Sequence, residues 1–137
     1  MRPPFLLDTC ACLWLLAGSL PAASLAVLTE AFNDGAMTYV SPITALEVGT
    51  LARKGRFRSH LTPQRWLETL LAMPGMKLAG MPAELLMASA LLPGEIQGDP
   101  YDRIIAATAR EYGFTVFTRD AELLAYARDG HLSALEC

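Results

Sequence analysis

Short apolar runs typical of buried β-strands alternate with longer segments typical of helices along the whole of this chain. Strands are expected at residues 4–7, 37–40, 76–79, 114–118 and 132–135. Helices are expected at residues 11–16, 22–32, 42–54, 63–72, 82–92, 100–112 and 121–127. Strands separated by helices predict a three-layer α/β/α fold around a mostly parallel sheet of four or five strands. The length fits one domain over residues 1–137, and no linker or repeat divides the chain.

Composition narrows the class of protein. Apolar residues make up 53% of the chain and charged residues 18%, which excludes a disordered protein. The net charge of -3 is not that of a general nucleic-acid-coating protein. Basic residues nevertheless cluster within six positions, and they offer either a track for RNA phosphates or simply a solvated helix end. The cluster consists of Arg53, Lys54, Arg56 and Arg58.

The N-terminal segment has two readings. Arg2, the apolar stretch after it and the small residues 17–19 resemble a secretory signal. Asp8 interrupts the stretch and opposes membrane insertion, so we favour a strand and helix of the folded domain. No other segment is apolar and long enough for a membrane span. The three cysteines form no C-x-x-C pair, which fits the reducing cytoplasm better than a disulfide framework or a zinc site.

Acidic residues follow two of the expected strands. Phe5-Leu6-Leu7 leads directly into Asp8, and the strand that ends at Thr118 leads through Arg119 into Asp120. The carboxyl ends of parallel strands share one rim, where active sites of open α/β sheets lie. We therefore expect Asp8 and Asp120 to lie close together.

Three further acids lie on expected helices. Glu47 falls within an apolar stripe made by Ile43, Leu46, Thr50 and Leu51, so its carboxylate should face inward and need a cation, a hydrogen-bond set or a proton. The alternative interpretation is that Glu47 pairs with an arginine or lies at the rim of the stripe. Asp99 precedes Pro100 and reads first as a helix cap. Asp102 faces the expected sheet and is the better ligand, although it could merely complement the helix dipole.

A convergence of Asp8, Glu47, Asp102 and Asp120 would require a counter-charge. Two like charges about 4 Å apart repel by roughly 4 kcal/mol at an effective dielectric near 20. Either some of the acids are protonated or a divalent cation neutralises them. Oxygen ligands select Mg²⁺ or Mn²⁺, and the two histidines, His60 and His131, lie beside no acidic motif. Such a cation suits phosphate chemistry.

The sequence around these acids resembles the PIN-domain family, in particular the VapC toxins of toxin–antitoxin pairs. The similar segments follow the family order across nearly the whole chain. They are LLDT at residues 6–9 followed by LWLL at 13–16, SPITALE at 41–47, GDPYDRIIAATA at 98–109 and TRD at 118–120. Departures are Cys10 and Gln97 at places where relatives often have His, and Leu46 at a frequent Trp.

The resemblance implies a PIN-like fold and a metal-dependent ribonuclease that hydrolyses RNA phosphodiesters by in-line attack of water. It makes Asp8 and Asp102 the most direct metal ligands, Asp120 a ligand partly through water, and Glu47 the residue that holds or activates the water. Thr9 and Thr118 would support the site by hydrogen bonds. It also implies a small VapB-like antitoxin that blocks the groove, often with a basic side chain, and a homodimer.

Rival interpretations fit less well. A haloacid-dehalogenase-type phosphatase needs a second Asp where Cys10 stands. A response-regulator receiver needs a strand-end Lys, and the two lysines, Lys54 and Lys77, follow a helix and fall in a weak strand. The open alternative is a catalytically silent PIN-fold module that only binds RNA or a protein partner.

Overall fold

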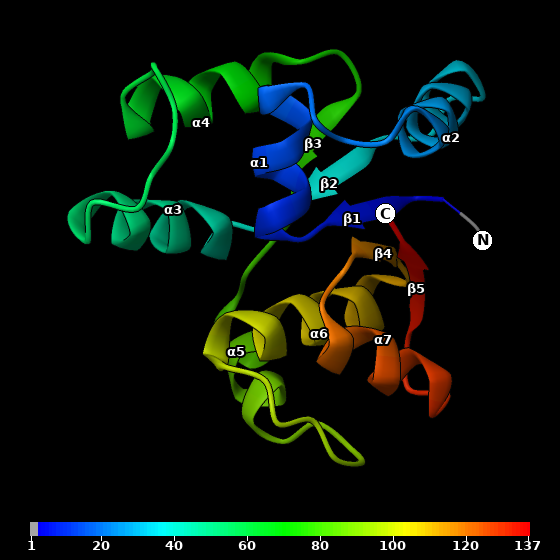
Figure 1. The fold of residues 1–137 in the computed structure, drawn as a ribbon. Helices are drawn as coiled ribbons and strands as arrows, with labels where there is room; N and C mark the ends of the chain where they lie inside the picture. Colours follow the sequence, from blue (N-terminus) through cyan, green and yellow to red (C-terminus); the bar gives the residue numbers. More distant parts are fainter. Residues whose placement is uncertain (1–2) are drawn as a thin grey trace.

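A computed structural model describes residues 3–137, which form seven helices and five strands (Figure 1). The strands are β1 (Phe5–Leu7), β2 (Thr38–Val40), β3 (Met76–Leu78), β4 (Thr115–Thr118) and β5 (Ser133–Glu136). The helices are α1 (Thr9–Ala17), α2 (Ala22–Asn33), α3 (Ile43–Arg53), α4 (Pro63–Ala72), α5 (Ala83–Ala90), α6 (Pro100–Tyr112) and α7 (Ala121–Arg128). Every expected element is present, and the boundaries differ by only a few residues.

The five strands form one sheet in the order β3-β2-β1-β4-β5, and all neighbouring strands are parallel. The strand β1 lies at the centre, with Leu7 opposite Val40 of β2 on one side and Phe117 of β4 on the other. The sequence predicted a mostly parallel sheet, and the observed sheet is wholly parallel. The chain moves outward in one direction from β1 through β2 to β3 and in the other through β4 to β5. The switch in direction therefore falls beside β1.

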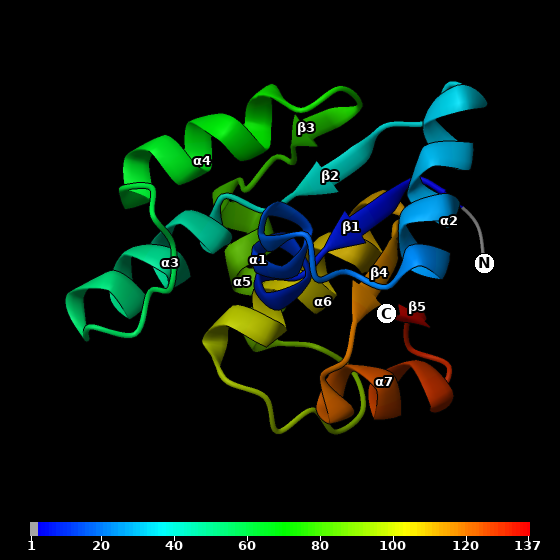
Figure 2. The ribbon, with the colours of Figure 1, turned by 45° about the horizontal axis from the view of Figure 1, so that its top comes forward.

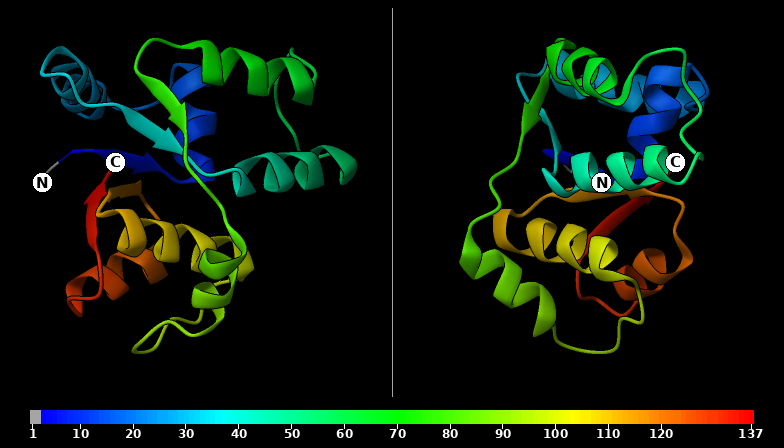
Figure 3. Two further views of the ribbon diagram at one scale, coloured as in Figure 1. Left: turned by 180° about the vertical axis from the view of Figure 1, so that it is seen from behind. Right: turned by 90° about the vertical axis from the view of Figure 1, so that its left-hand side faces the viewer.

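Helices cover both faces of the sheet, which confirms the three-layer architecture. The helices α1, α2 and α4 lie on one face and α5, α6 and α7 on the other, while α3 extends from the edge of the layers (Figures 1 and 3). Alternate side chains of each strand feed two separate cores. Phe5, Leu7 and Phe117 face the first helical layer, whereas Leu6 and Val116 face the second. Both faces are buried, so these strands read as continuous apolar runs.

The helix α3 packs through a different stripe from the expected one. Its buried residues are Ile43, Thr44 and Val48, whereas the side chain of Leu46 is 57% exposed. The prediction of an inward Leu46 was therefore wrong. Residues 44, 48 and 51 lie three or four positions apart on the face toward the domain, and residue 47 belongs to this face. Glu47 thus faces inward for a different reason from the one expected.

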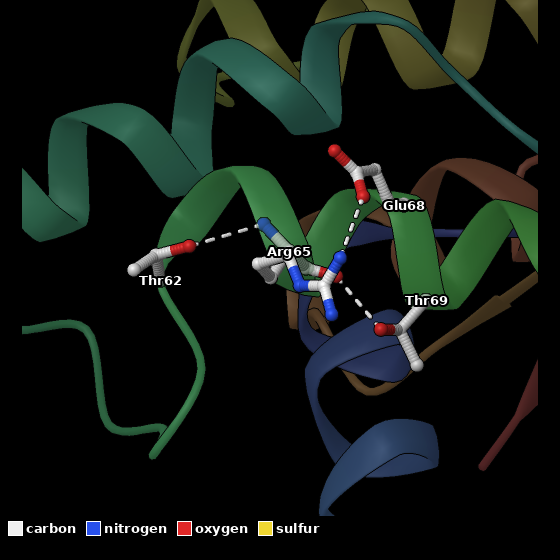
Figure 4. Close-up of polar contacts among 4 residues, drawn as sticks. All are labelled: Thr62, Arg65, Glu68 and Thr69. Carbon is white, nitrogen blue, oxygen red and sulfur yellow. Dashed lines mark hydrogen bonds and ion pairs between the residues drawn. The ribbon is translucent and has the colours of Figure 1, made fainter.

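The helix α4 begins with a local set of polar contacts (Figure 4). The hydroxyl of Thr62 accepts a hydrogen bond from the backbone N–H of Arg65 at 3.2 Å, which caps the helix as the Thr-Pro sequence predicts. The guanidinium of Arg65 lies 3.5 Å from the carboxylate of Glu68. Both side chains are mostly exposed, so this ion pair contributes less than about 1 kcal/mol to stability.

A single arginine joins the end of α5 and the irregular segment after it to the helix α6. The guanidinium of Arg103 donates hydrogen bonds to the carbonyls of Ser89, Ala90 and Ile96, at 3.0, 3.2 and 2.8 Å. Arg103 follows Asp102 directly in the first turns of α6. The loop is therefore anchored to the same part of the helix that carries an acid of the expected site.

The first part of the chain contributes to the fold as strand and helix, since residues 5–17 include β1 and the whole of α1. Arg2, part of the alternative signal interpretation, lies outside the described residues. Among residues 3–137, no single helix has the length and apolar character needed to cross a membrane. The helices α1 and α2 meet that test only as a pair bent by 98°.

Candidate active site

The acids that follow β1 and β4 lie side by side. The backbone N–H of Asp8 donates a hydrogen bond to the carbonyl of Phe117 at 3.2 Å, so the carboxyl ends of the two central strands coincide. A cleft of about 330 Å³ opens there, at the switch in strand direction. We call it the acid cleft, because five carboxylates line it: Asp8, Glu47, Asp99, Asp102 and Asp120.

Three of the five acids occupy helix N-caps. Asp8 accepts a hydrogen bond from the N–H of Ala11 at 2.8 Å and begins α1. Asp120 accepts from the N–H of Leu123 at 2.9 Å and begins α7. Asp99 accepts from the N–H of Asp102 at 2.9 Å and begins α6, which is the capping role expected from its sequence.

Two threonines hold the acids in place. The hydroxyl of Thr118 accepts a hydrogen bond from the N–H of Asp120 at 2.9 Å and interacts with the carboxylate of Asp8, so it links both strand-end acids. The hydroxyl of Thr9 interacts with the carboxylate of Glu47 and lies 3.0 Å from the hydroxyl of Thr44. Both threonines are buried, which fixes their geometry.

The electrostatics of the acid cleft favour protons when no cation is present. Burial raises the pKa of Asp102 to about 7, and the charges of the neighbouring acids add to this effect. Burial also raises the pKa of Glu47, against the opposing interaction with Thr9. The pKa of Asp8 is raised by burial as well, although hydrogen bonds from Thr118 and Ala11 oppose the rise. The cluster therefore carries more negative charge than its surroundings stabilise.

The donor set fits a hard divalent cation. All candidate ligands are oxygens, and Asp8 is only 6% exposed yet forms no ion pair within residues 3–137. In that same range, no three Asp, Glu, His or Cys side chains are placed so that they could hold a metal ion together. Unshielded carboxylates repel, and Asp8 and Asp120 each turn one oxygen to a helix N–H. Coordination by three acids therefore requires side-chain rotation.

The cleft also contains residues that the sequence analysis did not assign to the site. Among the described residues that line it, Arg119 is the one cation, and its guanidinium lies 3.8 Å from the centre of the Trp14 ring. Its Nε donates a hydrogen bond to the carbonyl of Cys137 at 2.8 Å. Its position between Thr118 and Asp120 is the sequence feature that could have identified it.

Cys10 also lines the cleft. Burial raises the pKa of its thiol to about 11, so the thiol is not a thiolate nucleophile at neutral pH.

The basic cluster expected to bind RNA lies outside the acid cleft and divides into two parts. Arg53 ends α3 and Lys54 follows it, and both are exposed. Arg56 and Arg58 line a second cavity beside α1. Two of the four residues therefore lie beside this cavity, and RNA binding by all four stays a prediction.

The raised pKa of Asp102 predicts a pH dependence of stability. The folded state binds this proton more tightly than the unfolded chain, whose value lies near 3.8, so the stabilising contribution is complete below that pH and is lost as pH rises through about 7. In EDTA, wild-type protein should lose stability over this window relative to Asp102→Asn, which should melt a few degrees higher at pH 8. Thermal unfolding against pH measures the difference, with the exposed Asp34→Asn as control. Parallel curves for wild type and Asp102→Asn would contradict it.

Comparisons with known proteins agree with this architecture. The sequence model described as "PIN domain" matches residues 5–129. The chain is 31% identical over 84 residues to ribonuclease VapC22 of Mycobacterium tuberculosis, and the match covers 61% of this chain and 63%, less than two thirds, of that protein. A chain in the structure of VapBC2 from Rickettsia felis, bound to a DNA fragment from their promoter, has a similar fold. Its TM-score is 0.70 at 18% identity, covering 96% of this chain and 97% of that one.

A chain of FitAcB from Neisseria gonorrhoeae is also similar in fold, with a TM-score of 0.52, 21% identity and 96% coverage of both chains. These structural likenesses concern the fold, whereas the match of the family model concerns the sequence. That match extends from the first residue of β1 to the end of α7 and includes every acid of the cleft. The protein therefore belongs to the PIN domain family.

Proposed function

We propose that this protein is a Mg²⁺- or Mn²⁺-dependent endoribonuclease of the VapC type. The observation that carries the proposal is the acid cleft, where a buried carboxylate that forms no ion pair within residues 3–137 lies among further acids at the carboxyl ends of β1 and β4. The sequence similarity to a protein named ribonuclease VapC22 supports RNA as the substrate. The chain over residues 1–137 acts, in this proposal, as a single PIN-like domain.

The resemblance to the PIN-domain family gives four of the five acids a role in this proposal. Asp8 and Asp102 would hold the cation most directly, and Asp120 would contribute partly through water. Glu47 orients the attacking water and accepts its proton, for which its raised pKa is suited. A bound divalent ion supplies the positive charge that offsets the charge building on the phosphoryl oxygens. Thr9 and Thr118 position the acids, and water attacks the phosphodiester in line with the leaving oxygen.

The biological part of the proposal is a toxin neutralised by a small VapB-like antitoxin in the cytoplasm. Exposed apolar side chains on and after α5 support a protein partner or a homodimer, because an apolar patch on the surface often marks an interaction site. They are Leu86, Met87 and Leu91, which are 41%, 69% and 74% exposed. Co-purification with the product of a small neighbouring reading frame is the expected sign of the antitoxin.

Removal of metal tests the enzymatic part. Purified protein should cleave cellular RNA in Mg²⁺ or Mn²⁺, lose this activity in EDTA and regain it when either ion is added in excess, because Asp8, Asp102 and Asp120 need a cation to bring their carboxylates together. Gel analysis of the RNA measures the products. Cleavage that persists in EDTA would exclude this chemistry. Absence of cleavage under all conditions would favour the silent PIN-fold module.

A further inference from the structure

A second cavity of about 510 Å³ lies beside the acid cleft. It is bounded by α1, the start of α4 and the segment between α3 and α4, which lie around one side of the domain (Figures 1 and 2). Trp14 lines both this cavity and the acid cleft, so a single ligand chain can enter both. We call the second cavity the basic aromatic pocket, because its lining includes Trp14, Arg56, Phe57, Arg58, His60 and Trp66.

Flat rings form the inner wall of the pocket. Trp66 is only 2% exposed, and Phe57 packs against it edge-on with ring centres 6.1 Å apart. Trp14 is partly exposed and is held from one side by the guanidinium of Arg119 at 3.8 Å. Unpaired bases of RNA bind proteins chiefly by stacking on such rings and on Arg guanidinium planes.

The charge of the pocket is opposite to that of the acid cleft. Arg56, Arg58 and His60 lie on its rim, and no acidic side chain is among the described residues that line it. Neither arginine forms an ion pair within residues 3–137, so both guanidinium groups are available to phosphate oxygens. A cation-binding cleft thus adjoins an anion-binding pocket, and Trp14 lies at their boundary.

We infer that the basic aromatic pocket binds an unpaired nucleotide of the RNA whose neighbouring phosphodiester lies in the acid cleft. The inference rests on the proposed function and adds the place on this chain where the nucleotide next to the cut is held. The base lies against the partly exposed rings of Trp14 and Phe57, which the buried Trp66 supports from the core, and its phosphate meets Arg56 and Arg58. Paired bases are stacked within their own helix and cannot enter. The basic rim favours this occupant over a neutral apolar segment of a protein.

The two tryptophans of the chain, Trp14 and Trp66, both line this pocket, and Trp14 also lines the acid cleft, so intrinsic fluorescence reports RNA binding in this region and the variants below localise it. The experiment uses Asp8→Asn protein, which should not cut the probe, and a short single-stranded RNA of mixed sequence. Stacking should quench the emission, and the same sequence in a duplex should bind at least about tenfold more weakly. Equal quenching by the single-stranded RNA and the duplex would overturn the inference. Quenching by neither would also overturn it and would favour a protein segment as the ligand of the pocket.

Two double variants that remove the same charge localise the binding. Arg56→Ala with Arg58→Ala should weaken binding of the single-stranded RNA by roughly tenfold or more, since it removes the phosphate contacts at the pocket. Arg53→Ala with Lys54→Ala removes two exposed charges outside the pocket and should change the affinity by less than about twofold. Phe57→Leu keeps the apolar volume but removes a ring, and should weaken binding roughly fivefold or more. Equal losses in both double variants would reduce the effect to general surface charge and refute the pocket.

The outcomes separate this inference from the proposed hydrolysis. An enzyme that cleaves RNA but shows none of these binding preferences would refute the pocket alone. A chain that shows the preferences but cleaves no RNA in Mg²⁺ or Mn²⁺ would refute the hydrolysis alone.

Discussion

Replacing Asp8 by asparagine is expected to lower RNA cleavage by about a thousandfold while the protein stays folded. The substitution removes the most buried carboxylate of the acid cleft and so weakens cation binding. A bound cation contributes several kcal/mol to stabilising the transition state, and each 1.4 kcal/mol corresponds to about tenfold in rate. Asparagine caps helices about as well as aspartate, so the hydrogen bond from the N–H of Ala11 to the side chain can persist. Initial rates of cleavage in saturating Mg²⁺ measure the effect.

The matched control is Asp34→Asn, which also removes one negative charge, at an exposed position after α2. It should leave the cleavage rate unchanged within about twofold. Circular dichroism and thermal unfolding should show that both variants are folded. Equal cleavage by Asp8→Asn and wild type would mean that the activity belongs to another site or to a contaminant.

Replacing Glu47 by glutamine is expected to lower the rate of cleavage by roughly a hundred- to ten-thousandfold, the usual contribution of a general base. The amide keeps the size of the side chain and can still accept a hydrogen bond from Thr9, but it cannot take a proton from water. Because Glu47 is not assigned as a principal ligand, Mg²⁺ binding should weaken less than in Asp8→Asn. Calorimetric titration with Mg²⁺, together with single-turnover rates, separates the two effects.

Glu68→Gln is the control for this substitution. Glu68 lies on α4 in an exposed pair with Arg65, so its loss should affect neither cleavage nor Mg²⁺ binding (Figure 4). If Glu47→Gln lost Mg²⁺ binding as completely as Asp8→Asn, Glu47 would be a principal ligand and not the base. If it cleaved RNA at the wild-type rate, proton transfer would not involve this residue.

The position of each element could be predicted because its ends are marked locally. Thr62 before Pro63 starts α4, and Gly113 ends α6 in a left-handed conformation that glycine adopts without strain. The order of the strands is not marked in this way. That β1 lies between β2 and β4 depends on pairing between residues far apart in the chain, such as Leu7 with Phe117.

The face of α3 could not be predicted because its apolar stripe is ambiguous. Leu46 is hydrophobic but exposed, whereas Thr44 is polar in part and wholly buried, where its hydroxyl meets that of Thr9. Packing partners from α1 decide between the two faces, and they are not visible in the sequence of the helix. The inward direction of Glu47 was correct although Leu46 was not.

The acids at strand ends could be predicted to lie together, because the carboxyl ends of parallel strands share one edge. Asp8 and Asp120 are the examples. The contact between Trp14 and Arg119 could not be predicted, because it joins the first helix to the segment after β4. For the same reason, the place of Arg56 and Arg58 beside α1 becomes visible only when the loop folds against that helix.

Three helices, α1, α6 and α7, begin at acids of the same cleft, so their N-terminal ends point toward it. Each such end carries a partial positive charge that offsets part of the repulsion among the carboxylates. The backbone thus supplies some of the compensation that small zinc-binding domains obtain only from their ion, without which they unfold. Under the proposed function, a newly synthesised chain could therefore adopt its fold first and bind a divalent ion afterwards. Chelation should then abolish the proposed activity reversibly, because the fold persists without the ion.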